Sequence, residues 1–282
     1  MALYNMKTLL SYAEENNLAI GAFNVSNLEM VLGVLKAAEE TNTPVILQIA
    51  EGRLNHSPLS YIGPMMVGAA KNAKVPVAVQ FDHGESMNLI REALNIGFSS
   101  IMFDGSHLPL EENIKKINEV SALCKSYGAT TEAELGTIGG TEDDGTPKDI
   151  IYTNPGVVPY FLGKTSVDAL AIAIGNVHGA YQGNPHLQLS ILEEVHKDNK
   201  TPLVLHGGSG LSSMDYRNCI DRGIRKINIA TSTFQCYVNA VQEYLQSHEH
   251  YNYFKLHEHV VLSIMKNTMD HIYIFNNKGA IN

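Results

Sequence analysis

The sequence predicts a closed (β/α)8 TIM barrel with one additional C-terminal helix, formed as a single domain over residues 1–282. Short apolar runs alternate with longer segments of helical period, and there are eight such runs. Hydrophobicity that is continuous along a run is typical of strands covered on both faces, as in parallel sheets. Eight runs with no break in composition favour the barrel over an open doubly wound sheet, which is the main alternative.

The eight expected strands are the apolar runs, and several of them begin at a proline. They span residues 19–25, 44–50, 76–82, 99–104, 129–136, 168–175, 202–208 and 226–231. Segments of helical period lie between and after the runs, at 28–41, 109–127, 212–222, 232–246 and 254–275. In the first of these, Met30, Val31, Val34, Leu35 and Ala38 form one apolar stripe. The segment 254–275 is expected to be the additional helix.

One interval, 137–153, is long and lacks an apolar period. Its glycine and acidic content predicts a mobile surface loop, and long loops on barrels usually carry function.

The composition limits the classes of function. Of 282 residues, 44% are apolar and 17% are charged, which is ordinary for a globular protein and excludes collagen-like and disordered classes. The net charge of −9 argues against nucleic acid or an anionic membrane as the main partner. The net charge does not exclude a small phosphorylated ligand, because the binding of such a ligand depends on the charges close to its site.

The three cysteines are widely spaced and include no CxxC pair, which indicates a reducing compartment with packed thiols. They are Cys124, Cys219 and Cys236. We see no pattern of a signal peptide, and no apolar run approaches the ~18 residues of a membrane span. We therefore expect a cytoplasmic protein.

Polar side chains gather at one end of the predicted strands. They are Asn24, Asp82, His83, Asp104, Ser106, Glu132, Glu134, His178, His206 and Asn228. In a parallel barrel, the carboxyl ends of all strands share one face, and barrel enzymes place their active sites there. The sequence therefore predicts an active site built from residues far apart along the chain.

Three of these residues, His83, His178 and His206, suggest a metal. Neutral imidazole is the usual zinc ligand, and three protein ligands with an open position mark a catalytic zinc site. The alternative is that each histidine is hydrogen-bonded in the core or in a loop. Three histidines at the ends of predicted strands, each close to glycine, favour the metal. Asp82 either transfers protons beside that metal or caps the next helix.

Glycine-rich turns follow the later strands, in GNVHGAY (175–181) and HGGSG (206–210). Glycine lets backbone N–H groups approach an anion, and barrels often bind phosphate in the loops after strands seven and eight. The long loop carries Glu142 and Asp143. A carboxylate there either closes over a substrate as a base or remains part of a solvated acidic loop.

Eight motifs together resemble one enzyme family. They are FDHG (81–84), FDGSHLPLEENI (103–114), EAELG (132–136), GGTED (139–143), YTNP (152–155), AIAIGNVHGAY (171–181), LHGGSG (205–210) and KINIAT (226–231). In this order they resemble the class II, zinc-dependent ketose-bisphosphate aldolases, which include fructose- and tagatose-bisphosphate aldolases. The resemblance runs from about residue 19 to residue 231 and is weaker in the C-terminal tail.

The resemblance implies reversible cleavage of a ketose 1,6-bisphosphate or 1-phosphate to dihydroxyacetone phosphate and an aldehyde. The three histidines are implied to hold one Zn²⁺, with Glu134 binding a displaced metal ion or supporting the site. Asp82 is implied to move the proton of the C4 hydroxyl, and Glu142 to exchange the C3 proton. Zinc, a Lewis acid, withdraws charge from the ketone and so stabilises the carbanion.

The same resemblance implies a substrate site. Its residues are Gly179, Gly207, Ser209 and Thr231 at the C1 phosphate, and Asn24 and Asn228 at the ketone and hydroxyl end. A monovalent cation, Na⁺ or K⁺, lies near the phosphate in many relatives. Because closed symmetric oligomers are common, we expect a homodimer or a homotetramer.

The sequence departs from the family pattern at three positions. Ala230 stands where fructose-specific relatives often have Asp and tagatose-type relatives have Ala. Ala50 stands where many relatives have a Ser for the distal phosphate, and the tail offers Lys255 rather than an Arg. We therefore predict that a 6-phosphate is not recognised in the usual way, and that the aldehyde partner is unphosphorylated, acidic or longer.

Three other functions compete with this one. A Schiff-base aldolase needs a lysine late in a strand, but the sixth run has none and Lys226 begins the eighth run at the wrong end. A zinc hydrolase on a barrel often has an HxH pair on strand one, whereas residues 22–24 are Ala-Phe-Asn. A catalytically inactive sugar-phosphate-binding barrel would not need Asp82 or Glu142.

Overall fold

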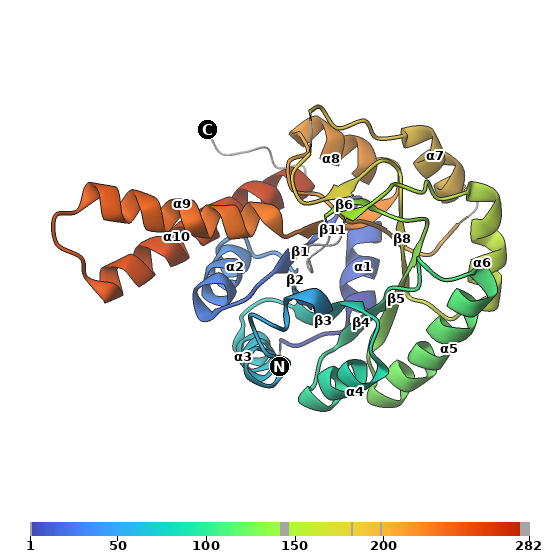
Figure 1. The fold of residues 1–282 in the computed structure, drawn as a ribbon, viewed down its shortest axis with the longest axis horizontal. Coiled ribbons are helices and arrows are strands. Elements are labelled where there is room, and N and C mark those ends of the chain that lie inside the picture. Colours follow the sequence, from blue (N-terminus) through green and yellow to red (C-terminus); the bar gives the residue numbers. More distant parts are fainter. Residues whose placement is uncertain (1, 142–146, 182, 198, 277–282) are drawn as a thin grey trace.

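A closed barrel of eight parallel strands forms the centre of the protein (Figure 1). The computed structural model describes residues 2–141, 147–181, 183–197 and 199–276. The barrel strands are β1 (Ile20–Asn24), β2 (Val45–Ala50), β3 (Val77–Gly84), β4 (Ser100–Phe103), β5 (Thr130–Leu135), β8 (Ala169–Ile172), β10 (Leu203–Leu205) and β11 (Ile224–Ile229). Each overlaps one predicted run, and β11 closes the barrel by pairing with β1. The predicted fold class is confirmed.

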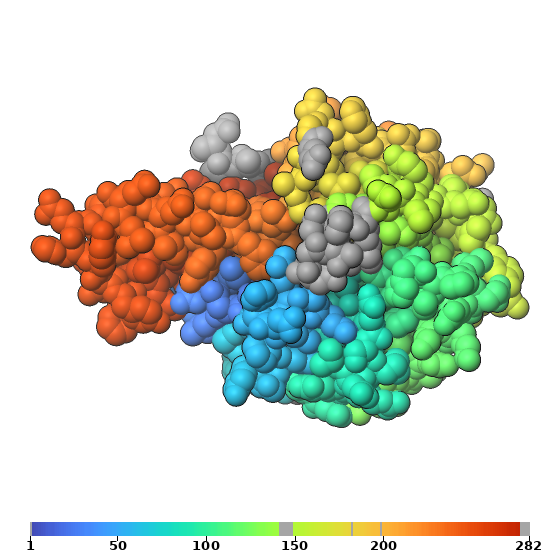
Figure 2. Space-filling model, viewed as in Figure 1, coloured from blue at the N-terminus to red at the C-terminus, as the bar shows by residue number. Residues whose placement is uncertain are grey.

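Helices cover the outside of the barrel. They are α2 (Leu28–Glu40), α3 (Leu59–Asn72), α4 (Met87–Ile96), α5 (Leu110–Tyr127), α6 (Val158–Lys164), α7 (Leu189–Lys197), α8 (Ser213–Ile220), α9 (Thr231–Ser247) and α10 (Tyr253–Phe275), with 3-10 turns η1 (Glu51–Arg53) and η2 (Pro155–Val157). The additional C-terminal helix is α10, which packs against α2 and α9. Helices α9 and α10 form an arm that stands out from the barrel (Figures 1 and 2). In the described part of the chain, no helix has the length and hydropathy of a membrane span.

A helix that precedes the first strand, α1 (Met6–Glu15), closes the amino end of the barrel. Met6, Leu9, Leu10 and Ala13 lie on one face of it, and they are buried in a cluster with the lowest inward residues of the strands. These four residues follow the i, i+3, i+4, i+7 spacing of an amphipathic helix. The apolar plug leaves the opposite, carboxyl end of the barrel as the end that can hold a polar site.

On several strands the inward side chains change from apolar to polar toward the carboxyl end. On β3, for example, Ala78 belongs to the apolar plug, Gln80 follows in the middle, and Asp82 lies at the carboxyl end. On β2, Ile46 is followed by Gln48 in the same way. Because alternate residues of a strand share a face, these side chains form layers across the barrel. The polar layers therefore support the mouth from below.

The interval 137–153, predicted to be a loop, contains regular structure. Strands β6 (Gly139–Thr141) and β7 (Pro147–Lys148) form a small sheet with β9 (Val177–His178). In this sheet Gly140 pairs with His178. The long segment is thus joined to the mouth of the barrel beside one of the predicted metal ligands.

Candidate active site

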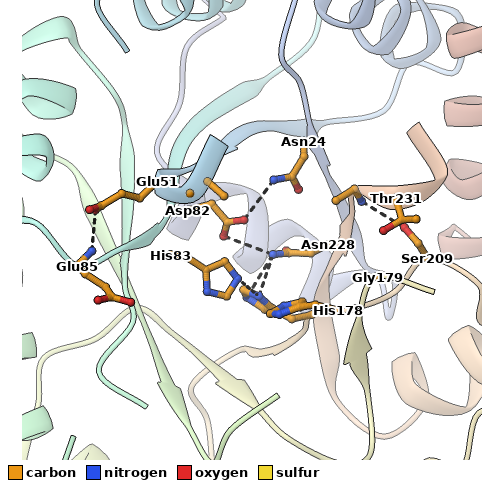
Figure 3. Close-up of a pocket in the computed structure, with 15 residues that line it drawn as sticks. Asn24, Glu51, Asp82, His83, Glu85, His178, Gly179, Ser209, Asn228 and Thr231 are labelled. Carbon is orange, nitrogen blue, oxygen red and sulfur yellow. Dashed lines mark hydrogen bonds between the residues drawn. The ribbon is translucent and has the colours of Figure 1, made fainter. Parts of the chain in front are cut away.

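A cavity of about 210 Å³ opens at the carboxyl end of the barrel (Figure 3). The structure brings ten of the twelve predicted site residues to its wall: Asn24, Asp82, His83, His178, Gly179, His206, Gly207, Ser209, Asn228 and Thr231. Glu134 is buried on β5 and lines a neighbouring cavity. Glu142 lies outside the described residues.

His83 reaches the cavity because the backbone changes direction at the end of β3. Its φ of 46° lies in the left-handed region, and the register between β3 and β4 shifts between Phe81 and Gly84. This conformation is uncommon for a residue with a side chain, and such strain tends to occur at functional sites. As a result, Asp82 and His83 both line the cavity although they are adjacent in the chain.

His83 and His206 face each other, and a buried carboxylate holds the far side of each ring. His206 follows β10 and is fully buried. Its Nδ1 lies 3.0 Å from His83 Nε2, and its Nε2 lies 2.8 Å from Glu132 Oε1. On the other ring, His83 Nδ1 lies 3.0 Å from Asp104 Oδ2. Each imidazole therefore has one nitrogen directed to a carboxylate and one directed into the cavity.

His178 is placed by two glycines that contact the backbone of β9. A Cβ at Gly140 would collide with the carbonyl oxygen of His178, and a Cβ at Gly207 would collide with that of Val177. Both glycines also have positive φ, which disfavours any side chain there. The close approach on both sides fixes the position of His178 beside the other two imidazoles.

The three histidines fit a metal ion. Each offers one ring nitrogen, and the three nitrogens lie within 4.8 Å of one another. Tetrahedral zinc with Zn–N bonds of about 2.0–2.1 Å separates its ligands by roughly 3.3 Å, close to the 3.0 Å between His83 and His206. Carboxylates on the far nitrogens orient histidine ligands in many metal sites. His83, Asp104 and Glu134 form a second group within the same distance, so Glu134 lies beside this site.

The two facing histidines differ in their electrostatic surroundings. Burial lowers the pKa of His83, but the carboxylates of Asp82, Asp104 and Glu134 together raise it more, so the pKa lies well above its usual value. Burial also lowers the pKa of His206, and Glu132 offsets this effect only in part. Carboxylates on one side of an imidazole pair create a negative potential that favours a bound cation.

Three side-chain amides donate to Asp82, and those of Asn24 and Asn228 are drawn in Figure 3. Gln48 Nε2 donates to Asp82 Oδ2 at 3.1 Å and Asn24 Nδ2 donates to the same oxygen at 3.4 Å. Asn228 Nδ2 donates to Asp82 Oδ1 at 3.5 Å. All four side chains are buried. Gln48 was not among the predicted site residues, although it is the lone polar residue in the apolar run 44–50.

Glycine turns and a helix N-terminus form one wall of the cavity. Gly179 and Gly207 have φ of 83° and 61°, and the 17-residue helix α9 begins at Thr231. The N–H groups of Ala230 and Ser232 donate to Ser209 Oγ, at 3.3 Å and 3.1 Å. Backbone N–H groups at a helix N-terminus attract anions. Two glycine turns and the positive end of a helix therefore meet at this wall.

Carboxylates occupy another part of the cavity wall, beside Ala50. Glu51 Oε2 accepts a hydrogen bond from the N–H group of Glu85 at 2.8 Å (Figure 3) and another from the N–H group of Ser86 at 3.0 Å. Glu51 and Glu85 both line the cavity, and the sequence analysis identified neither. Their position is set by turns after β2 and β3, for which the apolar periodicity carries no signal.

Comparison with known proteins gives one consistent result. The family model of class II fructose-bisphosphate aldolase matches residues 4–280. A fructose-bisphosphate aldolase of Staphylococcus aureus (strain Mu50) is 40% identical over 250 residues, which cover 88% of this chain and 87% of that protein.

Two solved structures agree with this match. The YdjI aldolase from Escherichia coli K12 is similar with a TM-score of 0.87 and 34% identity, covering 97% of both chains. The fructose-bisphosphate aldolase of Campylobacter jejuni has a TM-score of 0.79 and 27% identity, covering 98% of this chain and 96% of that one.

Proposed function

Because the chain belongs to the class II fructose-bisphosphate aldolase family and is an aldolase, we propose that this cavity cleaves ketose 1-phosphates between C3 and C4. The products are dihydroxyacetone phosphate and an aldehyde, and the reaction is reversible. The observation that carries this proposal is the group of three imidazole nitrogens within 4.8 Å of one another, with the Asp82 carboxylate at the same wall.

His83, His178 and His206 are the proposed zinc ligands, and Glu134 is a proposed ligand for a displaced ion. When bound, zinc supplies a Lewis acid that draws charge from the substrate's ketone and hydroxyl oxygens. The protein's part is to orient the ligands. Asp104 and Glu132 do so by contacting the far nitrogens of His83 and His206, at 3.0 Å and 2.8 Å.

Asp82 is the proposed base for cleavage. It takes the proton of the C4 hydroxyl while the C3–C4 bond breaks, so that C4 becomes the aldehyde carbon and the electron pair stays on C3. A proton delivered to C3 then gives dihydroxyacetone phosphate. Glu142 is the proposed donor of that proton, on the basis of the motif GGTED. The amides of Asn24, Gln48 and Asn228 keep the Asp82 carboxylate directed at the cavity.

The glycine wall is the proposed C1 phosphate site. Gly179, Gly207, Ser209 and Thr231 lie together there, beside the N-terminus of α9. Asn24 and Asn228 are proposed to contact the ketone and hydroxyl end. Fixing the phosphate orients the reacting carbons, which removes entropy before the barrier is crossed. The family resemblance also supports a Na⁺ or K⁺ ion near this phosphate.

We propose that the enzyme does not recognise a 6-phosphate, at the aldehyde end of the substrate, in the way that is usual for the family. Ala50, Glu51 and Glu85 line the cavity, and two carboxylates would repel a second phosphate group. Lys255 lies in the first turn of α10. This turn follows the connection between α9 and α10, which is at the end of the arm that projects from the barrel (Figure 1). Of the three expected alternatives, an unphosphorylated aldehyde, longer or not, is therefore the proposed partner of dihydroxyacetone phosphate, because the same carboxylates would also repel an acidic one.

The test compares kcat/KM for fructose, tagatose and sorbose bisphosphates with the corresponding 1-phosphates. We expect bisphosphates to have no advantage over 1-phosphates, with activity lost on chelation and restored by zinc. A strong preference for a bisphosphate would overturn the proposed specificity but leave the aldolase mechanism intact.

A Schiff-base mechanism has less support. Lys226 on β11 is fully buried, and its ammonium lies 2.9 Å from the carboxylate of Glu132. Trapping with borohydride in the presence of substrate should leave the enzyme active, whereas covalent labelling of a lysine would favour the Schiff base.

We further propose a homodimer or homotetramer in the cytoplasm. The arm carries exposed apolar side chains such as Tyr253 and Phe254, which supports self-association. All three cysteines are free thiols, and burial raises the pKa of Cys124 to about 11 and that of Cys219 to about 12. Protonated, packed thiols suit a reducing compartment.

A further inference from the structure

A fully buried lysine lies inside the barrel, beneath the proposed metal site. The Lys226 side chain is 0% exposed, as is that of its partner Glu132. Lys226 Nζ lies 2.9 Å from Glu132 Oε2 and 2.8 Å from Asn228 Oδ1. Burying a charged pair is costly and often adds no stability over an apolar pair. Stabilisation of the core therefore does not explain why a lysine lies at this buried position.

One branch of the network leads from Lys226 to His206. An ammonium can only donate hydrogen bonds, and a carboxylate paired with it can only accept them. Glu132 Oε2 accepts from Lys226 and, at 2.9 Å, from Gln80 Nε2. Glu132 Oε1 lies 2.8 Å from His206 Nε2, so that nitrogen must donate and must carry the proton. The lone pair of His206 is then on Nδ1, the atom that lies 3.0 Å from His83 Nε2.

The second branch leads from Lys226 to Asn228. Because Lys226 Nζ donates, Asn228 presents its oxygen to the lysine, and its NH₂ group points the other way. Asn228 Nδ2 lies 3.2 Å from His206 Nδ1 and 3.5 Å from Asp82 Oδ1, and Asn228 lines the wall of the cavity. The Lys226 ammonium can only donate hydrogen bonds, and it therefore decides which atoms donate and which accept along both branches of the network.

We propose that Lys226 is a positioning residue, which fixes His206 in the Nε2-protonated tautomer through Glu132 and directs the Asn228 amide into the cavity. The proposal rests on the proposed metal site, since the tautomer matters because it leaves Nδ1 free to bind a metal. Lys226 touches neither the cavity nor the substrate site. It acts through the two residues that it contacts.

The first experiment uses the wild-type protein without metal. Long-range ¹⁵N–¹H NMR of ¹⁵N-histidine protein, assigned with His206→Gln, reads the tautomer of His206 directly. We expect a single neutral form with the proton on Nε2. A proton on Nδ1, or an even mixture of tautomers, would overturn the proposal. This result does not depend on catalysis or on zinc binding.

The second experiment uses Lys226→Met combined with Glu132→Gln. The double substitution leaves no unpaired buried charge, and the glutamine can donate or accept toward His206. We expect a folded protein with mixed His206 tautomers and a zinc affinity reduced roughly 10–100-fold, measured by competition with a chelating dye. If this variant does not fold, the wild-type spectrum still decides the question.

Ser100→Ala is the matched control. Ser100 is buried on β4 and bonds to Thr130 Oγ1 and the N–H group of Met6, outside the network. We expect this variant to melt at a lower temperature with unchanged zinc affinity and His206 tautomer. If the double variant folds and keeps both the zinc affinity and the His206 tautomer of the wild type, Lys226 and Glu132 serve only in packing and the proposal is wrong. If wild-type protein shows the expected tautomer but binds no zinc, the proposed function fails and the inference about the tautomer stands.

Discussion

At the scale of single residues, the site depends on side chains that are hydrogen-bonded on the side away from the cavity and can contact a ligand on the other side. His83, His206 and Asp82 each have partners on the side away from the cavity. These three residues were predictable from the sequence because they end apolar runs, where a polar residue is conspicuous. The supporting roles of Gln48 and Glu132 were not predictable, because a role that acts through another side chain depends on contacts across the barrel.

Asp82→Asn tests the proposed base. Asparagine has nearly the same shape but cannot take the C4 hydroxyl proton, so we expect kcat to fall roughly 10²–10⁴-fold. KM and zinc content should change little, since the substitution leaves the histidines in place. Steady-state kinetics with a ketose 1-phosphate and metal analysis provide the measurement.

The control for this variant is Asp221→Asn, which changes an exposed carboxylate paired with Arg217 on α8. Its kinetics should match those of the wild type. A kcat for Asp82→Asn within a few-fold of the wild-type value would show that another group accepts the proton.

At the scale of elements, the position of His178 depends on a strand of two residues, β9. The eight barrel strands were predictable because they lie in short runs, most of them apolar, that alternate with segments of helical period. Neither β6 nor β9 was predicted, since two or three residues show no periodicity and their pairing joins segments far apart in the chain. Helix α1 was not predicted either, although its apolar stripe was a usable signal in the sequence.

Gly207→Ala tests how closely β9 is held. The new Cβ would collide with the carbonyl oxygen of Val177 and displace β9 together with His178. We expect zinc affinity to fall at least tenfold, as measured by competition with a chelating dye, in a protein that keeps its barrel by circular dichroism.

Gly128→Ala is the matched control, because Gly128 also has positive φ (71°) but meets nothing within 4 Å of an added Cβ. Both variants carry backbone strain of roughly 1–2 kcal/mol. Only Gly207→Ala should lose zinc affinity, and equal affinity in the two variants would contradict the proposed role of this glycine.

At the scale of the whole molecule, the barrel is closed by apolar residues at one end and carries the site at the other. The order of strands followed from the sequence because parallel barrels with helical connections leave few topologies. The arm of α9 and α10 did not follow, although both helices were predicted. Its direction depends on the packing of α10 against α2, which are more than two hundred residues apart in the sequence.

The exposed aromatic residues of the arm predict self-association. Tyr253 and Phe254 are 69% and 73% exposed, and burying them against a second copy would remove apolar surface from water. Light scattering coupled to gel filtration should give two or four times the mass of the chain. Tyr253→Ser with Phe254→Ser should lower that mass.

Tyr61→Ser is the control for this experiment, since Tyr61 is 79% exposed on α3, away from the arm. It should leave the mass unchanged. A wild-type protein that is monomeric at micromolar concentration would contradict the predicted association.

The most direct test of the proposed mechanism is anomalous diffraction at the zinc absorption edge, on crystals of the enzyme loaded with zinc. We expect one strong peak at the barrel mouth, with nitrogen atoms of His83, His178 and His206 at about 2.0–2.1 Å. Zinc bound elsewhere, or three imidazoles that stay together without an ion between them, would contradict the proposed active site.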